Sequence, residues 1–190
     1  MLLKKIKAVE RVLIQASKHS SKFANKTQLY CEKGCGKCCT TKNVEATVLE
    51  FIPAAYYLFR NDRINQVYEK IENMQDNSVC VFYNFLNDEN GQCEIYNYRG
   101  LICRLFGYST HFNKTGKLEL VSCNFIKTLP TSQHILIEQL KSAPKITDYY
   151  MKLSGIDLKM ANEQFPINEA IRKALEIVIL YFQFKGKKSA

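Results

Sequence analysis

The chain has 190 residues, of which 46% are hydrophobic, and a formal net charge of +9. It is long enough to bury a core of its own, which excludes a mini-protein that depends on metal for all of its stability. The positive charge suggests an anionic partner, but this count treats eight cysteines as neutral. If all eight bound two Zn²⁺ as thiolates, the charge would fall to +5, so nucleic-acid binding is not supported beyond net charge.

The first segment, residues 2–23, predicts an amphipathic helix. Its apolar residues fall on one face and its lysines on the others, and we expect the basic side to face solvent. Charges interrupt residues 2–15, so no continuous apolar stretch of a secretory signal is present there. We therefore expect a cytoplasmic protein with reduced thiols, because disulfides belong to oxidising compartments.

Residues 31–39, CEKGCGKCC, carry four of the eight cysteines in a short polar loop. Its glycines let the backbone fold back so that several sulfur atoms converge, and thiols placed in this way usually hold a metal. The adjacent pair Cys38 and Cys39 cannot easily chelate one ion together. We expect the pair to serve two metals, to serve two irons of one cluster, or to divide into a ligand and a non-ligand.

Two helices should follow the loop. Thr47 and Glu50 have the spacing of a capping box ahead of an apolar helix that Pro53 should kink. A second helix begins after Asp62, with one apolar face formed by five residues, Ile64, Val67, Tyr68, Ile71 and Met74.

The middle of the chain changes to an alternating pattern. Residues 79–86 and 92–96 predict a β-hairpin with Cys80 and Cys93 on its two strands. A second hairpin, with arms at 104–110 and 117–122, should bring Cys103 and Cys123 to neighbouring strand ends.

Three helices are expected in the last part of the chain, at 131–142, at 146–154 with Gly155 after its end, and at 166–184. The apolar stretch near residue 180 is shorter than the roughly 20 residues that a membrane-spanning helix needs. We expect it to pack in the core or, alternatively, to form a homodimer interface. The predicted fold is α+β: one domain over 1–190, in which helices at 1–30 and 124–190 flank a cysteine-cluster core at 31–123.

The cysteine pattern resembles that of the CxxCxxCC, or YkgJ-like, family of zinc- or iron-chelating domains. The loop at 31–39 matches the first block, and residues 93–104, CEIYNYRGLICR, match a second block that reads approximately C-x-I-Y-x-x-R-P-x-x-C-R. Two positions depart from the pattern, because three residues separate Cys31 from Cys35 and Gly100 replaces the usual proline. A more distant resemblance, to flagellin lysine N-methylases, does not transfer their reaction.

We expect most of the eight thiols to bind metal and two arginines of the second block to stabilise them. The candidate metal ligands are Cys31, Cys35, Cys38, Cys39, Cys80, Cys93, Cys103 and Cys123, and the arginines that would contact the metal centre are Arg99 and Arg104.

Three functions remain open. An iron–sulfur or iron-binding protein with a redox role is favoured, because the adjacent cysteines and the resemblance agree with it. The alternatives are a zinc-stabilised module that binds an unknown protein partner, and a metal-dependent modifying enzyme such as a protein methylase. Thiolates suit iron and zinc alike, so the sequence does not identify the metal.

Overall fold

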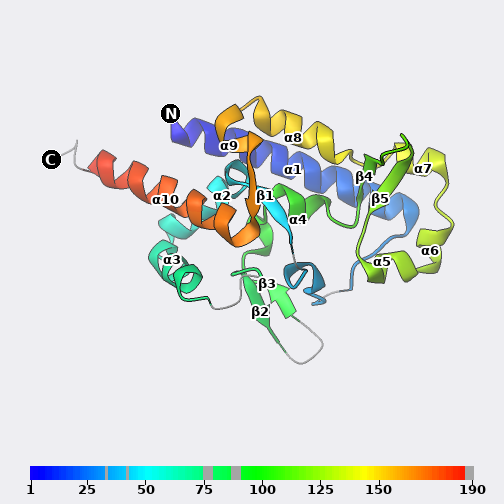
Figure 1. Cartoon of the computed structure of the whole chain (residues 1–190), viewed down its shortest axis with the longest axis horizontal. Helices are drawn as coiled ribbons and strands as arrows, with labels where there is room; N and C mark the ends of the chain where they lie inside the picture. The colour runs from blue at the N-terminus through cyan, green and yellow to red at the C-terminus, as the bar shows by residue number, and fades with distance from the viewer. Residues whose placement is uncertain (33, 42, 75–78, 87–90, 187–190) are drawn as a thin grey trace.

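The computed structural model describes residues 1–32, 34–41, 43–74, 79–86 and 91–186. Its architecture is α+β, as predicted, with helices around three two-stranded antiparallel sheets in the described part of the chain. The longest helix, α1 (Leu2–Thr27), runs through the middle of the molecule, with α8 (Ile146–Ser154) alongside it (Figure 1). One face of α1 is buried against α2 (Val48–Arg60), α4 (Leu101–Leu105) and α8, which confirms the predicted amphipathic helix.

Two further helices pack on α2 and complete the main core. They are α3 (Ile64–Glu72) and the long C-terminal helix α10 (Ile167–Gly186). Phe182 of α10 stacks on Tyr56 and Phe59 of α2, so the apolar end of α10 is used at least partly inside the core. The homodimer through this helix remains a prediction.

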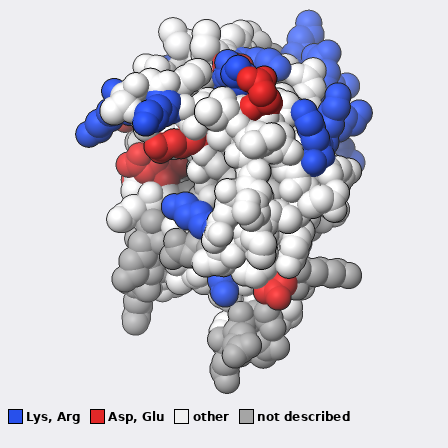
Figure 2. Space-filling view, turned by 90° about the vertical axis from the view of Figure 1, so that its right-hand side faces the viewer, with Lys and Arg blue, Asp and Glu red and all other residues white. Residues whose placement is uncertain are grey.

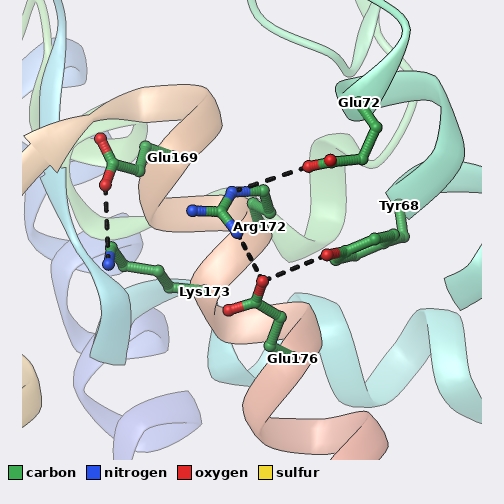
Figure 3. A network of polar contacts seen from close by, with 6 residues as sticks. All are labelled: Tyr68, Glu72, Glu169, Arg172, Lys173 and Glu176. Atoms are coloured by element: carbon green, nitrogen blue, oxygen red, sulfur yellow. Dashed lines mark hydrogen bonds and ion pairs between the residues drawn. The ribbon is translucent and has the colours of Figure 1, made fainter.

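A polar network fixes the angle between α3 and α10 (Figure 3). Arg172 lies 2.5 Å from Glu176 and 3.9 Å from Glu72, and the Tyr68 hydroxyl donates to Glu176 over 3.2 Å. The next residue of α10, Lys173, pairs with Glu169 one turn earlier at 3.5 Å. The charged side chains of this network are about a third or more exposed, so solvent screens their ion pairs. The network therefore orients the two helices and adds little to the free energy of unfolding.

One sheet was not expected from the sequence. Strand β1 (Glu45–Thr47) pairs antiparallel with β6 (Gln164–Pro166), which immediately precedes α10. Each strand has only three residues, so neither shows a recognisable alternation. This pairing joins the segment after the cysteine loop to the C-terminal quarter of the chain.

The two predicted hairpins exist, with shifted boundaries. The first is formed by β2 (Tyr83–Phe85) and β3 (Gly91–Cys93), and its turn lies outside the described residues. The second is formed by β4 (Ser109–Phe112) and β5 (Leu118–Val121). The prediction was wrong for two cysteines, because Cys80 precedes β2 and Cys103 lies on helix α4 rather than at a strand end.

The predicted helix at 131–142 is two short helices, α6 (Pro130–Gln133) and α7 (Ile137–Lys141), which follow α5 (Asn124–Thr128). The chain becomes extended at Leu136, with φ −74° and ψ 152°, and its amide donates to the Gln139 side chain over 2.8 Å to start α7. The predicted helix at 146–154 is confirmed as α8. Gly155 ends it with φ −67°, so this glycine is not needed for a left-handed conformation.

Within the described residues, none of the helices has the combination of length and apolar character needed to cross a membrane.

The short helix α9 (Leu158–Asn162) is fixed to α1 by the carboxylate of Asp157. Asp157 caps α9 by accepting from the Met160 amide over 3.1 Å, and it forms an ion pair with Lys5 of α1. Burial acts to raise the pKa of Asp157, but the bonds from Lys5 and Met160 outweigh it and hold the pKa below its ordinary value.

We expect Asp157→Asn, which can still cap α9, to lower the free energy of unfolding at pH 7 by up to about 1 kcal/mol. Asp157→Ala should cost about 1 kcal/mol more, because the cap is lost too. A lowered folded pKa stabilises the fold above the unfolded pKa near 3.9, and that contribution disappears as the pH falls through the folded pKa. Urea unfolding at pH 7 and below pH 4 measures both terms. An Asn variant as stable as wild type at pH 7 would contradict a role for the Lys5 pair.

Candidate metal centre

The cysteine loop is held against the first hairpin by its glycines. Gly36 has φ +60° and precedes a 3-10 turn, η1 (Lys37–Cys39), whose last amide donates to the Gly36 carbonyl over 2.8 Å. A Cβ atom at Gly36 would lie 2.5 Å from the carbonyl oxygen of Gly91, so only glycine permits this close approach. The Gly91 amide in turn donates to the Gly34 carbonyl over 2.9 Å. These contacts place the turn that carries Cys38 and Cys39 beside strand β3.

Cys80 and Cys93 reach the same place from two directions. The Cys80 amide donates to the Cys39 carbonyl over 2.9 Å, which joins the two segments directly. The neighbours of Cys80 are held by Asn168 of α10, whose buried amide donates to the Val79 carbonyl over 2.8 Å and accepts from the Val81 amide over 2.9 Å. Cys93 ends β3. The role of Asn168 was not predicted, because it depends on a contact across 87 residues of chain.

The last two cysteines lie at helices. Cys103 is in the middle of α4, and Cys123 is the residue before α5, where its sulfur accepts from the Ile126 amide over 3.5 Å. A thiol at this position replaces the usual serine or aspartate cap.

All eight cysteines line one cavity of about 500 Å³. They come from segments as far apart as residues 31 and 123, and each is a free thiol. The cavity wall also contains Arg99 and Arg104 together with apolar side chains, among them Phe51, Phe82, Phe106 and Ile126. The structure therefore brings together every residue that the sequence suggested for the site.

Contacts between the thiols divide them. The Cys39 side chain interacts with those of Cys38, Cys80 and Cys93. Around Cys31, the thiols that act on its charge are Cys35, Cys38 and Cys123. Yet among the described residues, no three Cys, His, Asp or Glu side chains are arranged so that they could hold one metal ion. The thiols surround a common space rather than a single point.

Three of these thiols differ in acidity for reasons visible in the site. Interaction with the Cys39 thiol, opposed by burial and assisted by the charge of Arg99, lowers the pKa of Cys38 to about 6. The same causes lower the pKa of Cys93. The pKa of Cys39 is raised, because its proton is shared with Cys38, Cys80 and Cys93.

Two other thiols resist ionisation. Burial raises the pKa of Cys31 to about 11, and the charges of Cys35 and Cys38 act in the same direction. Burial also raises the pKa of Cys103 well above its ordinary value. A metal that binds all of these sulfur atoms as thiolates must therefore displace protons.

The two arginines have different surroundings. Arg104 is held by three bonds: Nε donates to the Arg99 carbonyl over 2.8 Å, and its terminal nitrogens donate to the Ser17 hydroxyl and the Asn97 carbonyl over 2.7 and 2.6 Å. The Arg99 guanidinium lies 3.7 Å from the centre of the Tyr96 ring, and its buried Nε has no hydrogen-bond partner in the described part of the chain. Arg104 thus has a scaffolding role, whereas Arg99 supplies positive charge to the thiols.

The most buried charged residue of the site is Glu50, whose side chain is fully enclosed. Its Oε1 accepts from the amide and hydroxyl of Thr47 over 2.8 and 3.1 Å, which confirms the predicted capping box, and from the Tyr150 hydroxyl over 3.3 Å. Its Oε2 accepts from the Ile102 amide over 2.8 Å at the start of α4. Burial raises the pKa of Glu50, although these bonds oppose it. The sequence motif predicted the first pair of bonds but not the link to α4.

The same contact explains why Gly100 departs from the family pattern. A Cβ atom there would lie 2.7 Å from the Phe51 ring and 2.9 Å from Glu50 Oε2. The backbone φ of −61° would suit any residue, so space, not conformation, requires glycine.

The fold gathers eight cysteines, a residue type that binds zinc and iron in proteins, around one cavity. A family model named CxxCxxCC, described as "putative zinc- or iron-chelating domain", matches residues 30–124, half of the chain, and the chain belongs to this family. The resemblance seen in the cysteine pattern is thereby confirmed. Comparison with curated proteins and with solved structures gave no match.

We expect Glu50→Gln to lower the free energy of unfolding by about 1–3 kcal/mol, because the amide nitrogen would face either the Ile102 amide or the donors of Thr47 and Tyr150. Glu50→Ala should cost more, since all four bonds are lost and a cavity remains. Chemical denaturation measures both. The matched control is Glu45→Gln on β1, an exposed position that should change stability by less than about 0.5 kcal/mol. Equal effects at the two positions would contradict the bridging role of Glu50.

Proposed function

We propose that this protein binds iron–sulfur clusters through its eight cysteines and uses them in electron transfer. The observation that carries the proposal is the convergence of all eight thiols and Arg99 on one cavity of about 500 Å³. Thiols from five separate parts of the chain would not gather in this way by hydrophobic packing alone, because most of them keep contact with solvent.

The contacts between thiols support two sets of four. One set is centred on Cys39, which interacts with Cys80 and Cys93 as well as with Cys38. Cys80 is in turn the thiol that acts most strongly on Cys103. The other contains Cys31 and the three thiols that act on it, Cys35, Cys38 and Cys123. Cys38 contacts Cys39 and acts on Cys31, Cys93 and Cys103, so it lies between the two sets. We assign it to the set of Cys31 so that two adjacent residues need not chelate one ion. Four thiolates are the ligand set of one cluster.

The size of the cavity favours clusters over single ions. Four thiolates at about 2.3 Å from one zinc ion would stand about 3.8 Å from one another. A cluster separates its ligands by its own iron and sulfide atoms, so the thiolates stand further apart. The described side chains form no group of three that could hold one ion, although Cys39 is close enough to Cys38, Cys80 and Cys93 to interact with each of them. The cavity volume of about 500 Å³ leaves room for a polynuclear occupant.

Arg99 would set the electronic properties of such a cluster. Its guanidinium is positioned by the Tyr96 ring, and its charge acts on Cys38, Cys93 and Cys103. A fixed positive charge beside a cluster favours the reduced state and so raises the reduction potential. The same charge stabilises the thiolates needed for assembly.

A zinc-stabilised interaction module is the second candidate. The division into two sets of four thiols is also the ligand count of two structural zinc sites, and the family description includes zinc. In that case the loop at residues 31–39 would close around each ion, and the protein would carry no redox chemistry.

Protein isolated without oxygen should contain iron and acid-labile sulfide and should absorb visible light. Two [4Fe–4S] clusters would give about eight irons per chain. Cys93→Ser and Cys35→Ser, which belong to different sets, should each remove about half of the iron, and the double variant should remove nearly all of it. Elemental analysis and absorption spectra measure these quantities.

A colourless protein with stoichiometric zinc and neither iron nor sulfide would overturn the cluster and leave the zinc module. If Cys93→Ser alone removed all of the iron, the eight thiols would serve a single centre and the division into two sets would be wrong.

Removal of the metal should lower the melting temperature markedly, by roughly 10 °C or more, because the ligands connect the cysteine loop to hairpin and helix residues far along the chain. Calorimetry of the loaded and metal-free protein, each checked by elemental analysis, measures the shift. The double variant Cys35→Ser/Cys93→Ser is the control, since a chelator should leave its melting temperature unchanged. Equal melting of loaded and metal-free wild type would mean that the centre does not support the fold.

A further inference from the structure

The outer face of α1 carries a line of basic residues, called here the basic stripe. Its six cationic residues are spaced three, four or seven apart along the helix and are all exposed: Lys4, Lys7, Arg11, Lys18, Lys22 and Lys26. At 1.5 Å per residue the stripe is about 33 Å long, and its last three lysines follow at intervals of about 6 Å. Residues at these spacings lie on one side of a helix, so the six charges share one line.

Most of the net charge of the chain resides on this helix. Helix α1 contains seven Lys and Arg and one acidic residue, Glu10, which gives +6 of the total +9. If eight thiolates held two doubly charged ions, the whole chain would carry +5, so everything outside α1 would be slightly negative. The stripe therefore remains the positive side of the protein in either state.

These cations are not used within the fold. None of the six forms an ion pair in the part of the chain that the structure describes. Two of them donate hydrogen bonds to uncharged acceptors, Arg11 to the Lys7 carbonyl over 3.3 Å and Lys26 to the Ser142 hydroxyl over 3.4 Å. Seen from the end of the molecule at which α1 terminates, Lys and Arg side chains gather along one edge without acidic side chains among them (Figure 2).

We propose that this stripe binds the phosphate backbone of a nucleic acid without reading its sequence. A narrow line of charges on a rigid helix fits a linear polyanion, and each lysine that neutralises a phosphate gains from counterion release. A lipid surface fits less well, because the apolar side of α1 is buried in the core. Within this helix, the large apolar residues that remain exposed are Leu3 and Ile14, too few to insert into a membrane. The proposal does not depend on which metal the cavity holds.

The test is fluorescence anisotropy of a labelled 20-base-pair duplex DNA with the full chain, metal-loaded, at several salt concentrations. We expect binding that weakens steeply with salt, with a slope of log Kobs on log salt of about −3 to −5 if three to six phosphates are contacted. Lys18→Gln/Lys22→Gln/Lys26→Gln should weaken binding at least tenfold and reduce the slope by about 2–3. Circular dichroism melting checks that the variant folds.

The matched control removes three exposed lysines elsewhere, Lys114→Gln/Lys117→Gln/Lys127→Gln, and so changes the net charge equally. We expect it to bind like wild type. Equal weakening by both triple variants would show that only net charge matters and would overturn the proposal. The proposal would also be overturned if the wild-type protein did not bind the duplex at 50 mM salt. Binding of the protein to vesicles containing anionic phosphatidylserine, without binding to the duplex, would identify a membrane surface as the partner instead.

Discussion

The carboxylate of Glu50 is the contact on which the geometry of the cysteine cavity depends. It accepts hydrogen bonds from Thr47, the residue before α2, from the Ile102 amide at the start of α4, and from the Tyr150 hydroxyl of α8. A buried carboxylate destabilises the fold unless its oxygens accept hydrogen bonds. Displacement of α4 from α2 would break the bond from the Ile102 amide and leave one carboxylate oxygen without it. The position of α4 is fixed in this way, and Cys103, one residue after Ile102, is fixed with it.

The other cysteines are positioned by backbone contacts between segments that are distant in the sequence. Asn168 holds the chain around Cys80, the Cys80 amide bonds to the Cys39 carbonyl, and Gly36 packs against Gly91. These contacts join protein groups directly and place the cysteine-bearing segments around one cavity. Part of the entropy of bringing distant thiols together is thus offset by contacts between protein groups, and ligation of the thiols would offset a further part.

Local signals predicted much of this from the sequence. The amphipathic period gave α1 and α3, and the spacing of Thr47 and Glu50 gave the start of α2, because each depends on residues within a few turns. The cysteine pattern predicted which residues meet. The β1–β6 pairing and the Asn168 contacts were not predicted, since their partners lie more than 80 residues apart and each is too short to form a pattern. Cys103 was assigned to a strand because a single turn of helix, α4, shows no periodicity of its own.

Charge links the cavity to the rest of the molecule. Four thiolates around a doubly charged ion or cluster core leave about two negative charges, so two such centres leave about four within one cavity. Of the basic residues that line it, Arg99 and Arg104 are the two whose guanidinium groups act on the thiols, and Arg104 has its pKa lowered by burial and by the charge of Arg99. Positive charge on Arg104 is therefore costly in this buried place, and the charge of Cys103 offsets part of that cost. The second cysteine block carries both kinds of residue, and within the cavity Arg99 acts on the thiols of Cys93 and Cys103.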